Sequence, residues 1–253
     1  MEVIAKEPNW CKEINDIPEC DITLFFSSRQ RPDFVKEVLE RAYTKSSKEN
    51  TIETIVRFDN DDPLLIENLK VVSSYNQISI VGPRYDGYES LHIYYDECAS
   101  IARGDVLWQL NDDAWIVSQN WDKILLDYLK QFPKQIFACD FDILGVNGEG
   151  IMYSWCFPIM SRKMYQLLGN KFCYGDVKYI DTILMFTAQY LKMNKRIPVT
   201  VIHQHVWDNI PDETSAAGCL SAYAWMTPNR DKLNVLLKKL GFEIGEIFEK
   251  AMK

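Results

Sequence analysis

The chain has 253 residues, enough for one domain with a sizeable core and an extension. Hydrophobic residues make up 47% of it and charged residues 25%, which excludes an intrinsically disordered chain. The net charge of -8 argues against duplex nucleic acid as a partner, because phosphate contacts need clustered Lys and Arg side chains. It does not exclude small phosphate-bearing ligands, since a metal ion can supply positive charge locally.

Membrane and secretory signals are not found in the sequence. No run of about 18 uncharged apolar residues is present, so we expect no transmembrane segment. The first residues lack the basic and then apolar layout of a secretory signal. The seven cysteines are odd in number and include no C-x-x-C pair, which argues against a disulfide framework and a cysteine-based zinc site. These features predict a cytoplasmic protein with reduced thiols.

From residue 21 onward, short apolar runs alternate with amphipathic stretches. The apolar runs predict strands, which in chain order are 22–26, 54–58, 78–81, 105–110 and 136–139. The stretches between them predict helices that begin at Pro32 and Pro63 and others at 90–103, capped by Gly104, and 121–132. This alternation predicts parallel strands joined by right-handed crossovers, and therefore an α/β fold.

The second half of the chain is less regular, and the first 20 residues predict an irregular lead-in. Three glycines within 145–150 indicate a flexible loop. The other elements predicted in this half are strands at 152–160 and 199–202 and helices at 162–168, 181–191 and 230–253, the last divided by Gly241.

Three of the predicted strands end in polar clusters. Residues 27–29, 59–62 and 111–113 follow the first, second and fourth strands. Ligands of parallel sheets bind beyond the carboxyl ends of the strands. Three polar clusters on one edge are therefore better explained by a binding site than by chance.

Asp112 and Asp113 form the sharpest of these clusters. Adjacent carboxylates repel each other unless a cation lies near them, and such oxygen ligands suit Mg²⁺ or Mn²⁺. The alternative is an acidic turn in which an aspartate caps the next helix.

The other two clusters suit a nucleotide. Asp59 can accept hydrogen bonds from a nucleobase or a ribose, while Asp61 or Asp62 caps the next helix; the alternative is a turn and cap only. The amides and hydroxyls of residues 27–32 can hold phosphate or ribose oxygens, unless the segment only connects a strand to a helix. This loop is not glycine-rich, so neither a dinucleotide fingerprint nor a P-loop is present.

Two further groups of residues are candidates for chemistry. His203 and His205 close a strand on one face of it, where an imidazole can be a metal ligand or simply structural. Asp176 or Asp181 can act as a general base towards an acceptor hydroxyl, or can cap a helix. No G-x-S-x-G motif appears, so nucleophilic hydrolase chemistry is unsupported.

In their order and spacing, these parts resemble the nucleotide-sugar glycosyltransferases of the GT-A fold, and most closely glycosyltransferase family 2. The resemblance covers residues 21–208 and includes the loop 26–32, the acidic cluster 57–62 and a helix end that keeps Ala102 and Gly104. Residues 110–113 resemble the D-x-D metal motif. Arg196 follows the predicted helix as a basic residue does in the family. Asn111 replaces the first acid of the metal motif, and Ile180 stands where the family has Glu before its catalytic Asp.

The resemblance implies a single Rossmann-like GT-A domain at 21–208, with a mostly parallel central sheet flanked by helices. Its nucleotide-binding half is expected at about 21–113 and its acceptor half at about 114–208. The lead-in at 1–20 precedes it, and a helical C-terminal extension at 209–253 follows it.

The implied activity is transfer of a hexosyl-type sugar from a nucleoside-diphosphate sugar to a hydroxyl of a glycan or other acceptor, with inversion. A divalent cation, Mn²⁺ or Mg²⁺, would be held by Asp113 and His205. The catalytic base would be Asp181, with Asp176 in reserve. The residues expected to bind the nucleotide sugar are Ser27, Ser28, Arg29, Asp59, Arg84 and Asp112.

Two other functions compete with this one. A sugar nucleotidyltransferase has a similar sheet and acidic site, but it uses a glycine-rich first loop that this chain lacks. A catalytically weak or inactive nucleotide-sugar-binding module would keep the fold, and Asn111 and Ile180 are its best support.

Overall fold

The computed structural model describes residues 2–5, 20–85, 90–131, 138–144, 151–167, 170, 172 and 194–203. Within these residues, nine strands form one sheet in the order β1-β4-β3-β2-β5-β8-β7-β9-β6. The strands are β1 Glu2–Ala5, β2 Ile22–Ser28, β3 Ile52–Asp59, β4 Ile78–Gly82, β5 Val106–Gln109, β6 Ala114–Ile116, β7 Ala138–Leu144, β8 Ile151–Ser161 and β9 Asn194–His203. The helices are α1 Pro32–Thr44, α2 Leu65–Ser74, α3 Leu91–Ile101, α4 Trp121–Leu129 and α5 Arg162–Leu167.

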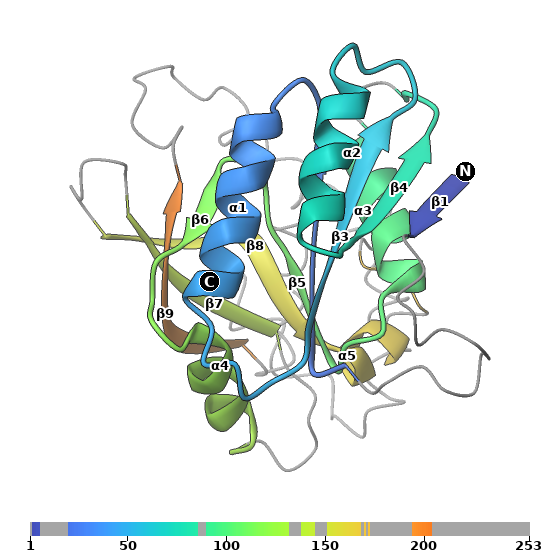
Figure 1. Cartoon of the computed structure of the whole chain (residues 1–253). Helices are drawn as coiled ribbons and strands as arrows, with labels where there is room; N and C mark the ends of the chain where they lie inside the picture. Colours follow the sequence, from blue (N-terminus) through green and yellow to red (C-terminus); the bar gives the residue numbers. More distant parts are fainter. Residues whose placement is uncertain are drawn as a thin grey trace.

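Helices cover both faces of the sheet, with α1 and α2 in front of it and α3 behind it in Figure 1. The main core forms where the buried faces of α1 and α4 meet the sheet, with Leu39 and Trp121 among its members. On β2, Leu24 and Phe26 belong to this core, whereas Phe25 contacts Tyr95 of α3 at 6.3 Å between ring centroids. Neighbouring residues of a strand point to opposite faces. Both faces of β2 are therefore buried, as the apolar run of this strand predicts.

The half of the sheet formed by β2, β3, β4 and β5 is parallel, as the strand–helix alternation predicts. β2 pairs in parallel with β3 on one side and with β5 on the other, and β3 pairs in parallel with β4. The chain thus runs outward from β2 through β3 and β4, and then returns to the other side of β2. In sheets of this kind, ligands bind beyond the carboxyl ends of the two strands at which the order reverses, here β2 and β5.

Three strands depart from the predicted parallel order. β8 lies between β5 and β7 and is antiparallel to both. Only six residues separate β7 from β8, too few for the crossover that a parallel pair needs. β1 pairs antiparallel with β4, so the prediction of an irregular lead-in was wrong for Glu2–Ala5. The short strand β6, which the sequence analysis missed, pairs antiparallel with β9.

Gly104 has a role other than the predicted helix cap. α3 ends at Ile101, and Ala102 already has an extended backbone. The Gly104 amide donates to Thr23 Oγ1 at 2.8 Å, and a Cβ on Gly104 would lie 2.4 Å from the Thr23 backbone nitrogen. Only glycine allows the chain to pass this close to the start of β2. The capping prediction was therefore wrong.

Several predicted features lie outside the described residues. They are the loop at 145–150, the helices at 181–191 and 230–253, and the extension at 209–253. None of the described helices is long and apolar enough to cross a bilayer.

Asp122 anchors α4 at the amino-terminal edge of the sheet. Its buried carboxylate accepts hydrogen bonds from Ser47 N and Oγ, both at 2.6 Å, and from Asn50 Nδ2 at 2.9 Å. Burial alone would raise the pKa of Asp122, but these hydrogen bonds outweigh it and hold the pKa below its usual range. The carboxylate therefore stabilises the folded chain in its ionised form.

We expect Asp122→Ala to lower the free energy of unfolding by about 3 kcal/mol at pH 7, because three half-buried donors lose their buried acceptor. The folded-state pKa is depressed, so this stabilisation is present above the unfolded pKa of about 4 and is lost as pH falls through the folded value. Urea unfolding of both proteins at pH 7 and pH 3 measures the change. The difference should narrow at pH 3, and Asp127→Ala, an exposed acid on the same helix, should leave stability unchanged.

Candidate functional site

The carboxyl ends of β2 and β5 lie side by side at one edge of the sheet. Ser28 closes β2, and its hydroxyl donates to Asp112 Oδ2 at 2.8 Å. Asp112 lies in the turn after β5, and both side chains are buried. Two of the three polar clusters are therefore in direct contact, across 84 residues of sequence.

Arg31, at the start of α1, binds the other oxygen of the same carboxylate. Its Nη1 lies 3.1 Å from Asp112 Oδ1, and its guanidinium sits over the Phe34 ring at 5.6 Å. The Arg31 side chain is 43% exposed, so it is held at the carboxylate while still facing solvent. Burial raises the pKa of Asp112, which the bonds from Ser28 and Arg31 oppose and neighbouring Asp113 reinforces.

The second cluster is joined to the first through Arg29. Its Nη1 contacts Asp59 Oδ2 at 3.2 Å and Asp61 Oδ1 at 2.5 Å. The hydrogen bond from Arg29 lowers the pKa of exposed Asp61 against the effect of desolvation, and nearby Arg84 adds to this. Because Arg29 and Arg31 lie two residues apart, one short loop binds the acids that follow β3 and β5.

Asp62 is a structural residue of the turn before α2, but the prediction that Asp61 or Asp62 caps this helix was wrong, because the N-cap position is Leu64 and no side chain caps it. Its buried carboxylate accepts hydrogen bonds from Leu64 N at 2.9 Å, Gln30 N at 3.0 Å and Asn68 Nδ2 at 2.9 Å. It shapes the turn before α2 and ties it to the loop after β2. Asp61, its neighbour, points instead to Arg29 at the surface.

Asn111 is tied into the fold where the resemblance expects an acid. Its Oδ1 accepts from Tyr95 of α3 at 3.1 Å and from Gln109 Nε2 at 2.9 Å. With two donors on the same oxygen, Asn111 fixes the turn after β5 against α3. Its amide oxygen is therefore used within the protein.

Asp113 faces a histidine. Its Oδ1 lies 3.3 Å from His203 Nε2, and the His203 ring packs edge-on against Phe157 at 4.9 Å. The pairing of Ala114 with His203 between β6 and β9 sets this approach. A carboxylate and an imidazole side by side are a ligand pair of the kind that Mn²⁺ accepts.

The described residues include no group of three or more His, Cys, Asp and Glu side chains placed to hold a metal ion. Two protein ligands are enough for a cation that is also bound by substrate phosphates. The buried Nδ1 of His203 has no hydrogen-bond partner within the described residues. Within the described residues, Asp113 and His203 are thus two side chains of ligand type 3.3 Å apart and not a complete metal site.

The other predicted site residues are not brought into these contacts. Ser27 is half-buried and precedes Ser28 on β2, so alternation points it to the opposite face. Arg84 is exposed after β4. His205, Asp176 and Asp181 lie outside the described residues.

The sequence analysis did not single out Arg31 or Arg57, the two other arginines at this edge. Arg57 is 1% exposed on β3 and binds Asp59, Glu97 and the Pro83 carbonyl. A charge within an apolar run was the available signal, since a buried charge needs a partner.

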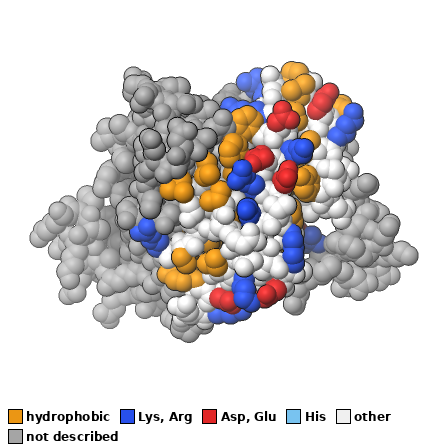
Figure 2. Space-filling model, turned by 60° about the vertical axis from the view of Figure 1, so that its left-hand side comes forward, with side chains coloured by type: hydrophobic (Ala, Val, Ile, Leu, Met, Phe, Trp, Pro, Cys, Tyr) orange, Lys and Arg blue, Asp and Glu red, His pale blue; other side chains and the backbone are white. Residues whose placement is uncertain are grey.

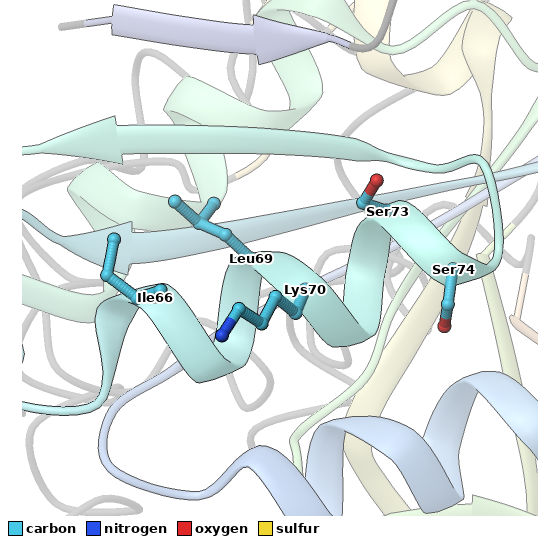
Figure 3. A pocket seen from close by; sticks show the side chains of 5 residues that line it. All are labelled: Ile66, Leu69, Lys70, Ser73 and Ser74. Atoms are coloured by element: carbon cyan, nitrogen blue, oxygen red, sulfur yellow. The ribbon is translucent and has the colours of Figure 1, made fainter.

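Elsewhere on the surface, charges of both signs are mixed. Figure 2 shows Lys and Arg side chains beside Asp and Glu on the described part of one face. A shallow hollow of about 470 Å³ runs along α2, lined by Ile66, Leu69, Lys70, Ser73 and Ser74 (Figure 3). None of the predicted site residues lines it.

No family model matches the sequence, and neither does any curated protein. Solved structures of TarS from S. aureus do match. For TarS 1-349 in complex with UDP, the TM-score is 0.55 at 13% identity, over 73% of this chain and 60% of that one. For the complex with UDP-GlcNAc, the TM-score is 0.52 at 12% identity, over 73% and 58%. For a longer TarS structure, it is 0.53 at 12% identity, over 73% and 36%.

The likeness shows the fold. This chain has the α/β architecture of TarS, with a mostly parallel central sheet flanked by helices. The chain spans about 60% of the length of TarS 1-349 in that match.

The adjacent acids Asp61 and Asp62 should differ sharply when replaced. Asp62→Ala leaves three donors of the turn without their acceptor and is expected to lower the free energy of unfolding by about 2 kcal/mol. Asp61→Ala removes an exposed partner of Arg29 and should leave stability unchanged. Urea unfolding of both variants is the measurement, and equal losses would contradict the structural role of Asp62.

Proposed function

We propose that this protein is a glycosyltransferase that moves a sugar from a nucleoside-diphosphate sugar to an acceptor hydroxyl. The observation that carries the proposal is the contact between Ser28 and Asp112, which joins the polar loops after β2 and β5 at the edge where ligands of parallel sheets bind. TarS shares the fold and has been solved with UDP and UDP-GlcNAc. A uridine diphosphate sugar is therefore the first donor to test.

The loop after β2 and the acids after β3 and β5 are proposed to bind the donor. Asp59 would contact the nucleoside, and Arg29 would lie beside it. Ser28 and Asp112 would line the donor site, and Arg31, already held at Asp112, would offer positive charge to the diphosphate. Ser27 and Arg84 remain proposed contacts of the donor.

The acid and imidazole after β5 and β9 are proposed to hold a divalent cation, Mn²⁺ or Mg²⁺. Asp113 would supply the carboxylate oxygen, and His203 or His205 would supply the nitrogen. When bound, such a cation would stabilise the negative charge that grows on the leaving diphosphate. The pairing of β6 with β9 places Asp113 and His203 side by side.

The resemblance to glycosyltransferase family 2 supports an inverting, hexosyl-type transfer. Asp181, with Asp176 in reserve, is proposed to accept the proton of the acceptor hydroxyl as that oxygen attacks the face opposite the leaving group. Holding both substrates in line would then provide much of the acceleration. A glycan is the first acceptor class to test.

A reducing, cytoplasmic location is proposed as well. Cys20 and Cys98 are buried thiols, and burial raises the pKa of Cys20 to about 11. Such thiols are inert packing groups and suit a compartment in which cysteines stay reduced.

A second candidate function is a nucleotide-sugar-binding module without turnover. The observation that favours it is Asn111, which stands where the resemblance expects an acid. Its amide oxygen accepts hydrogen bonds from Tyr95 and Gln109, so it is not offered to a metal ion. Donor binding without transfer would be the result expected of such a module.

A thermal-shift panel of nucleoside-diphosphate sugars, with and without Mn²⁺, tests the proposed donor site. A ligand at 100 times its Kd adds about 2.7 kcal/mol, or a rise of about 5–10 °C in Tm for a domain of this size. We expect uridine diphosphate sugars to give this rise with Mn²⁺ and Asp113→Ala to lose the metal-dependent part. Asp105→Ala, at the other end of β5, should respond like wild type. If Asp113→Ala shows the same Mn²⁺-dependent rise in Tm as wild type, the proposed cation site is contradicted.

Turnover separates the transferase from the binding module. With UDP-GlcNAc and a mixture of glycan acceptors, we expect wild-type protein to release UDP and Asp181→Asn to be slower by about 1,000-fold, because proton transfer to the base is lost. The Kd of the variant for UDP-GlcNAc should stay at the wild-type value. If Asp181→Asn turns over normally, the same assay on Asp176→Asn tests the reserve base.

A further inference from the structure

Arg57 is a buried charge inside the central sheet. It stands on β3 between the buried residues Val56 and Phe58 and is 1% exposed. A buried ion costs several kcal/mol unless it is paired and hydrogen-bonded, and an apolar residue of similar volume is often at least as stable. Stability alone is therefore a weak explanation for an arginine at this position.

The guanidinium of Arg57 is bound from several sides. Nη1 pairs with Asp59 Oδ1, Nη2 donates to the Pro83 carbonyl, and Nε lies 3.2 Å from Glu97 Oε2. The Tyr94 ring lies 4.0 Å from the guanidinium carbon. These contacts use the planar fork of arginine, which lysine cannot reproduce.

The residues packed around Arg57 hold its guanidinium in one position. Tyr85 lies on it at 5.5 Å and donates its own hydroxyl to Glu97 Oε1 at 3.1 Å, which fixes that carboxylate as well. A Cβ on Gly82 would stand 3.1 Å from Arg57 Nη2, so the glycine leaves room for the guanidinium. Arg57 is thus a rigid support for whatever it holds.

Arg57 holds one oxygen of Asp59 and leaves the other to Arg29. The Asp59 Oδ2–Arg29 Nη1 distance is 3.2 Å, and Arg29 is 24% exposed. Arg29 also has a second carboxylate, Asp61, at 2.5 Å. Arg29 can therefore leave Asp59 without losing its counter-charge, whereas Arg57 is enclosed and stays.

We propose that Arg57 is a positioning residue for donor recognition: it fixes Asp59 Oδ1 so that Oδ2 is presented to the nucleoside, in the place that Arg29 occupies in this structure. This inference rests on the proposed function, in which Asp59 contacts the nucleoside. The groups that a carboxylate oxygen would bind there are N–H or O–H donors of the base or ribose. Arg57 itself touches no part of the donor.

Calorimetric titration with UDP in the presence of Mn²⁺ tests the proposal. Arg57→Lys keeps the charge but loses the fork, and we expect UDP to bind about tenfold more weakly, the scale seen when the partner of a ligating side chain is removed. Asp59→Asn should weaken binding at least as much. The double variant should bind no more weakly than Asp59→Asn alone, because both changes act through the same carboxylate.

The matched control is Arg103→Lys. Arg103 binds the buried carboxylate of Glu53 at 2.6 Å, at the opposite end of the same strand β3. In urea unfolding, Arg103→Lys should lose about as much stability as Arg57→Lys, while its affinity for UDP stays within about twofold of wild type. If Arg57→Lys does not fold, Glu97→Gln loosens the same guanidinium and should weaken UDP binding about threefold.

The outcomes are distinct. If Arg57→Lys binds UDP with wild-type affinity, the positioning role is overturned; where Arg57→Lys does not fold, the same result in Glu97→Gln overturns it. The role is also overturned if the loss of UDP affinity in the double variant equals the product of the losses in Arg57→Lys and Asp59→Asn. Failure of the wild-type protein to bind UDP overturns the proposed donor site and this inference with it. Weaker binding in Arg103→Lys, to the same extent as in Arg57→Lys, would show that the loss follows stability.

Discussion

The hydrogen bond from Ser28 to Asp112 depends on the reversal of strand order at β2, and so does the rest of the site. Because β2 pairs in parallel with β3 on one side and with β5 on the other, the carboxyl ends of all three strands lie at one edge of the sheet. The hydroxyl of Ser28 and the carboxylate of Asp112 join the loops after β2 and β5 at that edge. The positions of Arg29 and Arg31 follow, since both belong to the loop that Ser28 begins.

At this edge of the sheet, the negative charges of the carboxylates are neutralised by paired arginines. Asp59 and Asp112 are buried carboxylates within a chain of net charge -8, which is an unfavourable setting for a diphosphate. Arg29, Arg31 and Arg57 each pair with one of them, and two of the three come from one short loop. Arg29 and Arg31 keep partial exposure, so an anionic ligand can share them with the acids that hold them now. A cation at Asp113 would add positive charge on the remaining side.

Much of the fold was predictable, because it follows from local pattern. The strands β2 to β5 and the helices between them were read from apolar runs and from Pro32, and their parallel pairing from the length of the connections. The strand predicted at 152–160 is β8, but its antiparallel pairing with β5 and β7 was not predicted, because no local pattern encodes it. Gly104 was taken for a helix cap, because its close approach to Thr23 joins residues 81 positions apart.

The site was predictable as a set of strand ends but not as a set of contacts. The sequence indicated Ser28, Asp59 and Asp112 through their positions after apolar strands. It did not indicate that Arg31 binds Asp112 or that Arg57 binds Asp59, since these pairs depend on side-chain direction within the folded edge. The sequence showed that Asn111 replaces an acid of the motif, but it did not indicate the hydrogen bonds of Asn111 with Tyr95 and Gln109.

Strand β3 carries a buried carboxylate paired with arginine at each end, and the comparison of the two shows how a role can be assigned. At the amino end, Glu53 receives Arg103 and also the Thr23 hydroxyl, and these bonds join α3 to the start of the sheet. At the carboxyl end, Asp59 receives Arg57 on one oxygen, and a partly exposed arginine, Arg29, contacts the other. The chemistry of the two pairs is alike. What differs is that ligands of a parallel sheet approach the carboxyl edge alone, so only the second pair is placed to act on one.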